Sequence, residues 1–221
     1  MKNKKTIYQF VLDKSGSMSD CLSGTISGFN EQLKKITELQ AQFPEQEFCL
    51  SLTTFNDKIA YPFRDLQVQN IPLLSVENYV PSGMTALLDA IGFSIKRIKE
   101  VHGESVEENE ASVVFVILTD GHENSSRFFD YLQIASQIKE LESTGKWNFS
   151  FVGADIDAMQ TSRMLNIQEQ NVMSFSKDDM RKNMMDIGNS LGAYAKSKHE
   201  GNIKTGIFDI FEDRDRRKNK E

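Results

Sequence analysis

Three short segments combine aspartates with hydroxyl side chains in a pattern that suits a bound cation. They are Asp13-Lys14-Ser15-Gly16-Ser17, Ser82-Gly83-Met84-Thr85 and Thr119-Asp120-Gly121. Two aspartates that share a crevice need a cation or a proton between them, because like charges repel. The remaining candidate donors are hydroxyl oxygens, without cysteine or histidine, and an all-oxygen set favours a hard ion. We therefore predict Mg²⁺, with Mn²⁺ or Ca²⁺ as alternatives, held by Asp13, Ser15, Ser17, Thr85 and Asp120.

Two predicted strands would bring the aspartates together. Asp13 closes a β-rich run at 6–12, and Asp120 follows the run SVVFVIL at 112–118. The second run is apolar throughout, as expected for a central strand covered on both faces. Open α/β sheets bind ligands at the carboxyl ends of their strands. If these two strands are neighbours, about 4.8 Å apart, both carboxylates overhang one crevice.

The rest of the chain alternates between β-rich runs and segments of helical period. The helices are expected at 22–43, 86–101, 128–141, 156–165 and 178–195. Further strands are expected at 48–55, 58–66, 147–152 and 171–175, and the acidic stretch 104–110 is expected to be a solvated loop. This order predicts an α/β fold with a doubly wound, mainly parallel six-stranded sheet, one antiparallel edge strand and helices on both faces.

The three oxygen-rich segments resemble a known motif. D-x-S-x-S at Asp13 to Ser17, G-M-T-A-L around Thr85 and T-D-G at Asp120 are similar to the metal-ion-dependent adhesion site (MIDAS) of von Willebrand factor A domains. The likeness extends over about residues 6–195 and implies that family's Rossmann-like fold. It also implies that the serines and the threonine contact the metal, and that the aspartates bind it directly or through water. The chain looks most like the compact intracellular members of bacteria and phages.

This resemblance predicts a binding module rather than an enzyme. We expect a protein partner whose Asp or Glu carboxylate completes the metal shell, and the sequence predicts no oligomeric state. One alternative is a metal-dependent phosphatase or other hydrolase with Asp13 as nucleophile. Ser15 then stands where the haloacid-dehalogenase type needs an acid. A second alternative is a scaffold subunit whose metal is purely structural.

Several residues near the motifs have more than one interpretation. We hypothesise that five of them form the rim that selects the partner: Lys14, Met18, Met84, His122 and Glu123. Asp89 either hydrogen-bonds to the metal shell from behind or simply suits the start of a helix. His102 and His199 lie in charged surroundings and are expected at the surface.

Composition limits the class of partner and the domain count. The formal charge is −6, from 26 Lys and Arg against 32 Asp and Glu, and no basic stripe appears before the last residues, so nucleic acid is not expected as a partner. The basic start leads into an apolar stretch that Asp13 ends, so neither an export signal nor a membrane span is expected. Two cysteines without metal or disulfide spacing agree with the cytoplasm. We expect one domain at 1–197 and a tail at 198–221, whose apolar cluster either packs on the domain or docks elsewhere.

Overall fold

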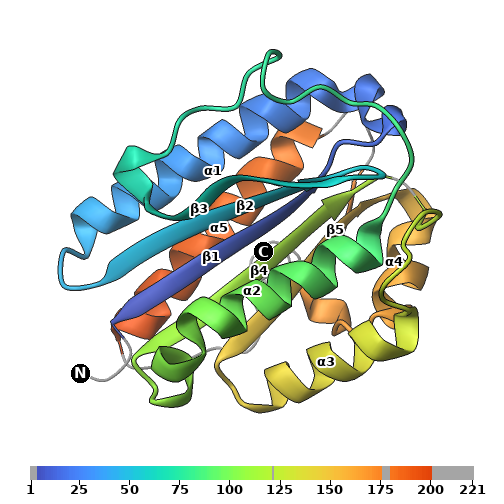
Figure 1. The fold of residues 1–221 in the computed structure, drawn as a ribbon. Helices are drawn as coiled ribbons and strands as arrows, with labels where there is room; N and C mark the ends of the chain where they lie inside the picture. Colours follow the sequence, from blue (N-terminus) through green and yellow to red (C-terminus); the bar gives the residue numbers. More distant parts are fainter. Residues whose placement is uncertain (1–3, 121, 176–179, 201–221) are drawn as a thin grey trace, which may run out of the picture.

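The computed structural model describes residues 4–120, 122–175 and 180–200, which form a six-stranded sheet in the order β3-β2-β1-β4-β5-β6 (Figure 1). All neighbouring strands are parallel except β2 and β3. The predicted doubly wound sheet with one antiparallel edge strand is therefore confirmed. The strands are β1 (Lys5–Asp13), β2 (Glu47–Phe55), β3 (Ile59–Gln67), β4 (Ala111–Thr119), β5 (Trp147–Ala154) and β6 (Val172–Phe175).

Five α-helices in the described residues cover the two faces of the sheet (Figure 1). They are α1 (Leu22–Gln42), α2 (Leu87–Glu107), α3 (Tyr131–Ser143), α4 (Asp155–Met164) and α5 (Met180–His199). Short 3₁₀ turns lie at Gly16–Cys21, Val68–Asn70 and Glu169–Asn171. None of the helices in the described part of the chain is long and apolar enough to cross a bilayer.

Alternating side chains divide the core into two layers. In β1, Tyr8 and Phe10 pack in the layer under α1 and α5, while Ile7 and Val11 pack in the layer under α2, α3 and α4. This is the two-residue period of a strand covered on both faces. Every residue of β4 is buried, as predicted for the central strand.

The acidic stretch at 104–110 is not the loop that was predicted, because α2 continues to Glu107. Two residues near this end of the helix are buried, Val106 at 4% and His102 at 8% exposure. His102 Nε2 lies 2.9 Å from Asp65 Oδ1 of β3, so the prediction of a surface histidine is wrong. Burial alone would raise the pKa of the Asp65 carboxyl, but the hydrogen bonds from His102 and Cys49 and the charges of His102 and Lys5 together lower it.

The start of α3 and the end of α5 also differ from prediction. Helix α3 begins at Tyr131 rather than at 128, because Asp130 caps it in a reciprocal pair of hydrogen bonds with Gln133. Helix α5 continues to His199, so the expected boundary after residue 197 falls inside this helix. His199 is exposed, as predicted. The apolar cluster and charged end predicted for the tail lie outside the described residues.

Candidate metal centre

Asp13 is held in one orientation at the carboxyl end of β1. Strands β1 and β4 are neighbours and pair Leu12 with Leu118, so Asp13 ends its strand beside Thr119. Thr119 Oγ1 donates to Asp13 Oδ2 at 2.6 Å, and the Ser15 amide donates to Asp13 Oδ1 at 2.7 Å. The Tyr79 hydroxyl donates to the Asp13 carbonyl oxygen. The Asp13 carboxylate is therefore fixed by its own loop and by the neighbouring strand.

The electrostatic surroundings of Asp13 disfavour its lone negative charge. Burial raises the pKa of Asp13 to about 6. The hydrogen bonds from Thr119 and Ser15 oppose that rise, and the nearby negative charge of Asp120 adds to it. A cation at this position would stabilise the ionised carboxylate against both the cost of burying its charge and the repulsion from Asp120.

A chain of hydrogen bonds joins three more of the predicted ligands. The hydroxyl oxygens of Ser15 and Ser17 lie 3.1 Å apart, and Ser17 Oγ donates to Asp120 Oδ1 at 2.7 Å. Ser15 is 2% exposed, while Ser17 is an exposed residue. Four predicted ligands thus form a continuous row of oxygens that leads from the buried strand end to the surface.

The loop that contains Thr85 is fastened to the first oxygen-rich segment through its backbone. The Gly16 amide donates to the Gly83 carbonyl at 3.1 Å, and the Ser82 amide donates to the Lys14 carbonyl at 2.8 Å. Gly83 has φ +76°, and a Cβ there would lie 2.1 Å from Asp57 Oδ1. Glycine is therefore favoured at 83 by its conformation, whereas the exposed Asp57 side chain could move aside for a Cβ.

Thr85 is also fastened to the loop that follows β4. Its amide donates to Asn124 Oδ1 at 2.8 Å, and its carbonyl accepts from the amides of Asn124 and Ser125 at 3.0 and 3.2 Å. Thr85 is 3% exposed. The structure therefore joins four predicted ligands by direct hydrogen bonds and places the fifth in a loop bonded to both neighbouring segments.

Asp89 braces the loop after β4 through hydrogen bonds to its backbone. Its carboxylate accepts from the amides of Arg127, Phe128 and Phe129 at 2.8, 2.9 and 3.0 Å. It lies in the first turn of α2, which agrees with the helix-start interpretation. The role as an anchor for residues 127–129 was not predicted, because these partners are 38 to 40 residues away in sequence.

One of the five residues proposed for the rim is placed elsewhere, and a second has a further role. Met18 is 0% exposed and belongs to the core, because the 3₁₀ turn Gly16–Cys21 points it inward. The Glu123 carboxylate accepts from the amides of Leu88, Ser125 and Ser126, so it holds the loop together. Four residues remain rim candidates: Met84 is 52% exposed, His122 is exposed, and Lys14 and Glu123 are partly exposed.

The donor set fits a hard divalent cation. It consists of two carboxylates and three hydroxyls. A different kind of site, built from three or more His, Cys, Asp or Glu side chains, is not found among the described residues. The donor set provides only oxygen and leaves part of the coordination shell to water, as Mg²⁺ sites commonly do. Gly121, which follows Asp120, lies outside the described residues.

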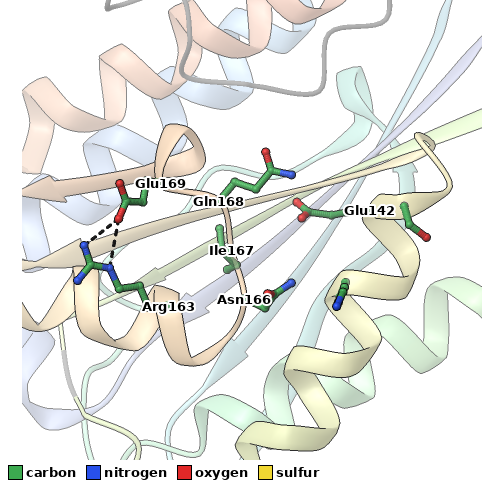
Figure 2. A pocket seen from close by; sticks show the side chains of 8 residues that line it. Glu142, Arg163, Asn166, Ile167, Gln168 and Glu169 are labelled. Carbon is green, nitrogen blue, oxygen red and sulfur yellow. Dashed lines mark hydrogen bonds and ion pairs between the residues drawn. The ribbon is translucent and has the colours of Figure 1, made fainter.

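A separate cavity of about 530 Å³ lies beside α3, α4 and the connection to β6. Figure 2 shows Arg163 and Glu169 at this cavity, joined by an ion pair of 2.8 Å. The lining residues are Lys139, Glu142, Ser143, Arg163, Asn166, Ile167, Gln168 and Glu169. None of the five predicted ligands lines it, so this cavity is not part of the metal centre.

Comparison with known proteins identifies a family and a fold. The family model for the von Willebrand factor type A domain matches residues 9–189. No curated protein matches the chain. One similar solved structure is the vWF domain of the type V pili tip protein Mfa5 from Porphyromonas gingivalis, with a TM-score of 0.59, 8% identity and coverage of 87% of this chain and 96% of that one.

Two further solved structures belong to longer chains. The ArnB paralog VWA2 from Sulfolobus acidocaldarius has a TM-score of 0.56 and 14% identity, with 84% of this chain and 46% of that chain covered. Proximal thread matrix protein 1 from the mussel byssus, solved with a zinc-occupied MIDAS motif, has a TM-score of 0.51 and 18% identity, with 86% and 46% covered. The present chain thus spans less than half the length of these two proteins. At identities of 14% and 18%, the comparison shows a shared fold and nothing more.

Proposed function

The chain belongs to the von Willebrand factor type A family, and on that premise we propose that it is a divalent-cation-dependent protein-binding module. A protein partner would supply an Asp or Glu carboxylate to the metal. The observation that carries this proposal is the row of linked oxygens that begins at buried Asp13 and reaches the surface at Ser17. A ligand at the exposed end of that row is open to a partner.

The five residues would have distinct parts in holding the ion. Asp13 and Asp120 would supply negative charge, and Ser15, Ser17 and Thr85 would supply neutral oxygens. Thr119 orients the Asp13 carboxylate by its hydrogen bond to Oδ2. Bound Mg²⁺ would provide positive charge and a coordination position at which a carboxylate can replace water.

The overall charge makes such binding selective. With a formal net charge of −6, the chain repels acidic partners at long range. Attraction would then depend on the short-range contact of one carboxylate with the ion. A partner that cannot place its carboxylate correctly gains nothing from the site.

Calorimetric titration with MgCl₂ tests the ligand assignment directly. The wild type should bind the ion, and Thr85→Ala should weaken binding by about tenfold or more, because one oxygen donor is lost. Thr37→Ala is the matched control, since it removes a threonine hydroxyl that bonds only within α1, to the Leu33 carbonyl. Equal Mg²⁺ affinity for wild type and Thr85→Ala would contradict the assignment.

Affinity capture from the native cell extract tests the binding role. Partners retained by the wild type in Mg²⁺ should be lost in chelator and reduced with Thr85→Ala, because chelator removes the ion and the variant holds it more weakly. If the same proteins are captured in all three conditions, recognition does not pass through the metal.

The two alternatives give different results with the same variants. If the metal is purely structural, Thr85→Ala lowers the melting temperature and leaves the captured proteins unchanged. If the protein is a hydrolase, it turns over a generic phosphate ester, and Asp13→Asn abolishes the turnover. Ser15, two residues after Asp13, offers no titratable acid for that chemistry, which favours the binding role.

The cytoplasm remains the compartment that we propose. The sequence argument rests on the two cysteines, and both Cys21 and Cys49 are buried thiols. Burial raises the pKa of Cys49 to about 12, which keeps this thiol protonated and unreactive. Fractionation of the native cells would test the location.

A further inference from the structure

A shallow groove runs between α2 and α3, which lie side by side in Figure 1. Its volume is about 410 Å³, and its lining residues are Gly92, Lys96, Lys99, Glu100, Phe129 and Gln137. A Cβ at Gly92 would lie 2.6 Å from the Phe129 ring. The glycine therefore lets this ring pack against the helix, and the groove has an aromatic wall.

An aromatic cluster continues this wall to the surface. The Phe93 ring lies 5.3 Å from the Phe129 ring and 5.4 Å from the Phe128 ring, measured between centroids. Phe128 is 69% exposed, and Leu132 in the first turn of α3 is 83% exposed. Single exposed apolar residues are ordinary, but an exposed ring that packs on the aromatic cluster of a groove, with a second large exposed apolar residue four positions later in the sequence, is typical of a contact surface.

The backbone beneath the cluster is held rigidly. Asp89 accepts hydrogen bonds from the amides of Arg127, Phe128 and Phe129. Phe128 is therefore presented to solvent by a braced loop, and it loses little conformational freedom when it is covered. Such preorganisation is expected of a binding surface.

The rim of the groove is basic although the chain as a whole is acidic. Lys96 and Lys99 line it from α2, and Arg127 is exposed in the adjacent loop. Glu100 is the one acidic residue of the lining, and it pairs with Lys96 at 3.9 Å. Among the described residues Lys99 forms no ion pair, so its charge is available to a partner.

We propose that this α2–α3 surface binds an amphipathic helix of a partner protein, with apolar side chains over Phe128 and Leu132 and acidic side chains against Lys96 and Lys99. A groove between two helices accommodates a third helix, and the basic rim selects acidic flanks. None of the residues that form this surface is a predicted metal ligand. Binding here therefore requires no metal ligand and does not rest on the function proposed above.

Fluorescence anisotropy with two synthetic helical peptides tests the proposal. Both peptides carry the same leucine face, and their flanks are glutamate in one and lysine in the other. The full-length protein in chelator should bind the glutamate peptide and should bind the lysine peptide at least about tenfold more weakly. Similar affinity for both peptides, or no binding of either, would overturn the proposal.

Surface variants locate the binding. Leu132→Ser and Lys96→Glu/Lys99→Glu should each weaken the glutamate peptide by about tenfold or more, and the double charge reversal should improve the lysine peptide. Leu73→Ser is the matched control, because Leu73 is 62% exposed on the loop that precedes the metal centre. An effect of Leu73→Ser equal to that of Leu132→Ser would contradict the location.

A second copy of the chain is the competing occupant. Sedimentation equilibrium of wild type and Leu132→Ser distinguishes it. A monomer at all concentrations agrees with the proposal, whereas a dimer that Leu132→Ser dissociates assigns the surface to self-association instead. Mg²⁺ titration of the same samples reports on the metal site separately.

Discussion

Replacing Lys198 with methionine should remove a pH-dependent part of the free energy of unfolding. Lys198 lies in the last turn of α5 and is 8% exposed. Its Nζ lies within hydrogen-bond distance of three oxygens, the Lys5 carbonyl at 2.8 Å, Thr6 Oγ1 at 2.7 Å and Ser112 Oγ at 2.8 Å. The amine therefore fastens the final helix to the beginnings of β1 and β4.

Burial lowers the pKa of Lys198 from 10.5 to about 7. Between these two values the unfolded chain carries a proton on this lysine that the folded chain has released. Unfolding then takes up a proton, so the free energy of unfolding rises with pH across this window. The stabilisation is complete above pH 10.5 and is lost as the pH falls to about 7.

The size of the effect follows from the pKa difference. A tenfold difference in proton affinity is worth about 1.4 kcal/mol. Allowing for partial protonation near pH 7, the free energy of unfolding should rise by about 2 kcal/mol between pH 7 and pH 9 because of Lys198. Lys198→Met should lack this rise.

Urea unfolding followed by the fluorescence of Trp147 measures the difference, because this is the single tryptophan of the chain and it is buried. The free energy of unfolding of the wild type minus that of Lys198→Met should increase by about 2 kcal/mol from pH 7 to pH 9. Lys196→Met is the control, since Lys196 is exposed in the same turn. A difference that stays constant would show that Lys198 keeps its charge and that its three acceptors compensate for burial.

Three further predictions concern the metal centre and its supports. Gly83→Ala should weaken Mg²⁺ binding in calorimetry and destabilise the fold by about 1 kcal/mol, because φ at residue 83 is +76°. Gly103→Ala, with nothing within 4 Å of its Cβ, is the control, and equal effects would refute the argument. Mg²⁺ affinity should fall as the pH drops through about 6, where the Asp13 carboxyl takes up a proton. Equal affinities at pH 5.5 and 7.5 would contradict this. Asp89→Asn should cost about 1–3 kcal/mol and speed hydrogen exchange at residues 127–129, because three amides lose a charged acceptor; unchanged exchange would show that the loop is held by other contacts.

Local sequence patterns were sufficient for the fold and for the set of candidate ligands. The unbroken apolar run before Thr119 identified the central strand, and the helical period of α1 located that helix to within a residue. The oxygen-rich segments were visible because each places its donors within five residues. Only a few strand orders are then possible, because two parallel strands in one sheet must be joined by a crossover connection of fixed handedness.

Boundaries that depend on single buried contacts were predicted less well. Helix α2 continues through an acidic stretch because Val106 and His102 find partners in the core and on β3. Met18 was placed at the rim because it directly follows the first oxygen-rich segment, but the 3₁₀ turn after Ser15 directs its side chain into the core. In both cases the energy of burial outweighs the local pattern.

The sequence by itself determined that Asp13, Ser15, Ser17, Thr85 and Asp120 bring oxygen-bearing side chains to strand ends and one loop, and it predicted them as metal ligands. Only the tertiary structure decided which residues support them: Tyr79 and Thr119 on Asp13, Asn124 on Thr85, and Asp89 and Glu123 on the loop after β4. These hydrogen bonds join residues between 35 and 106 positions apart. A local sequence pattern cannot predict pairs this far apart in the sequence, because the partners meet only after the sheet has assembled and has brought the ends of β1 and β4 side by side.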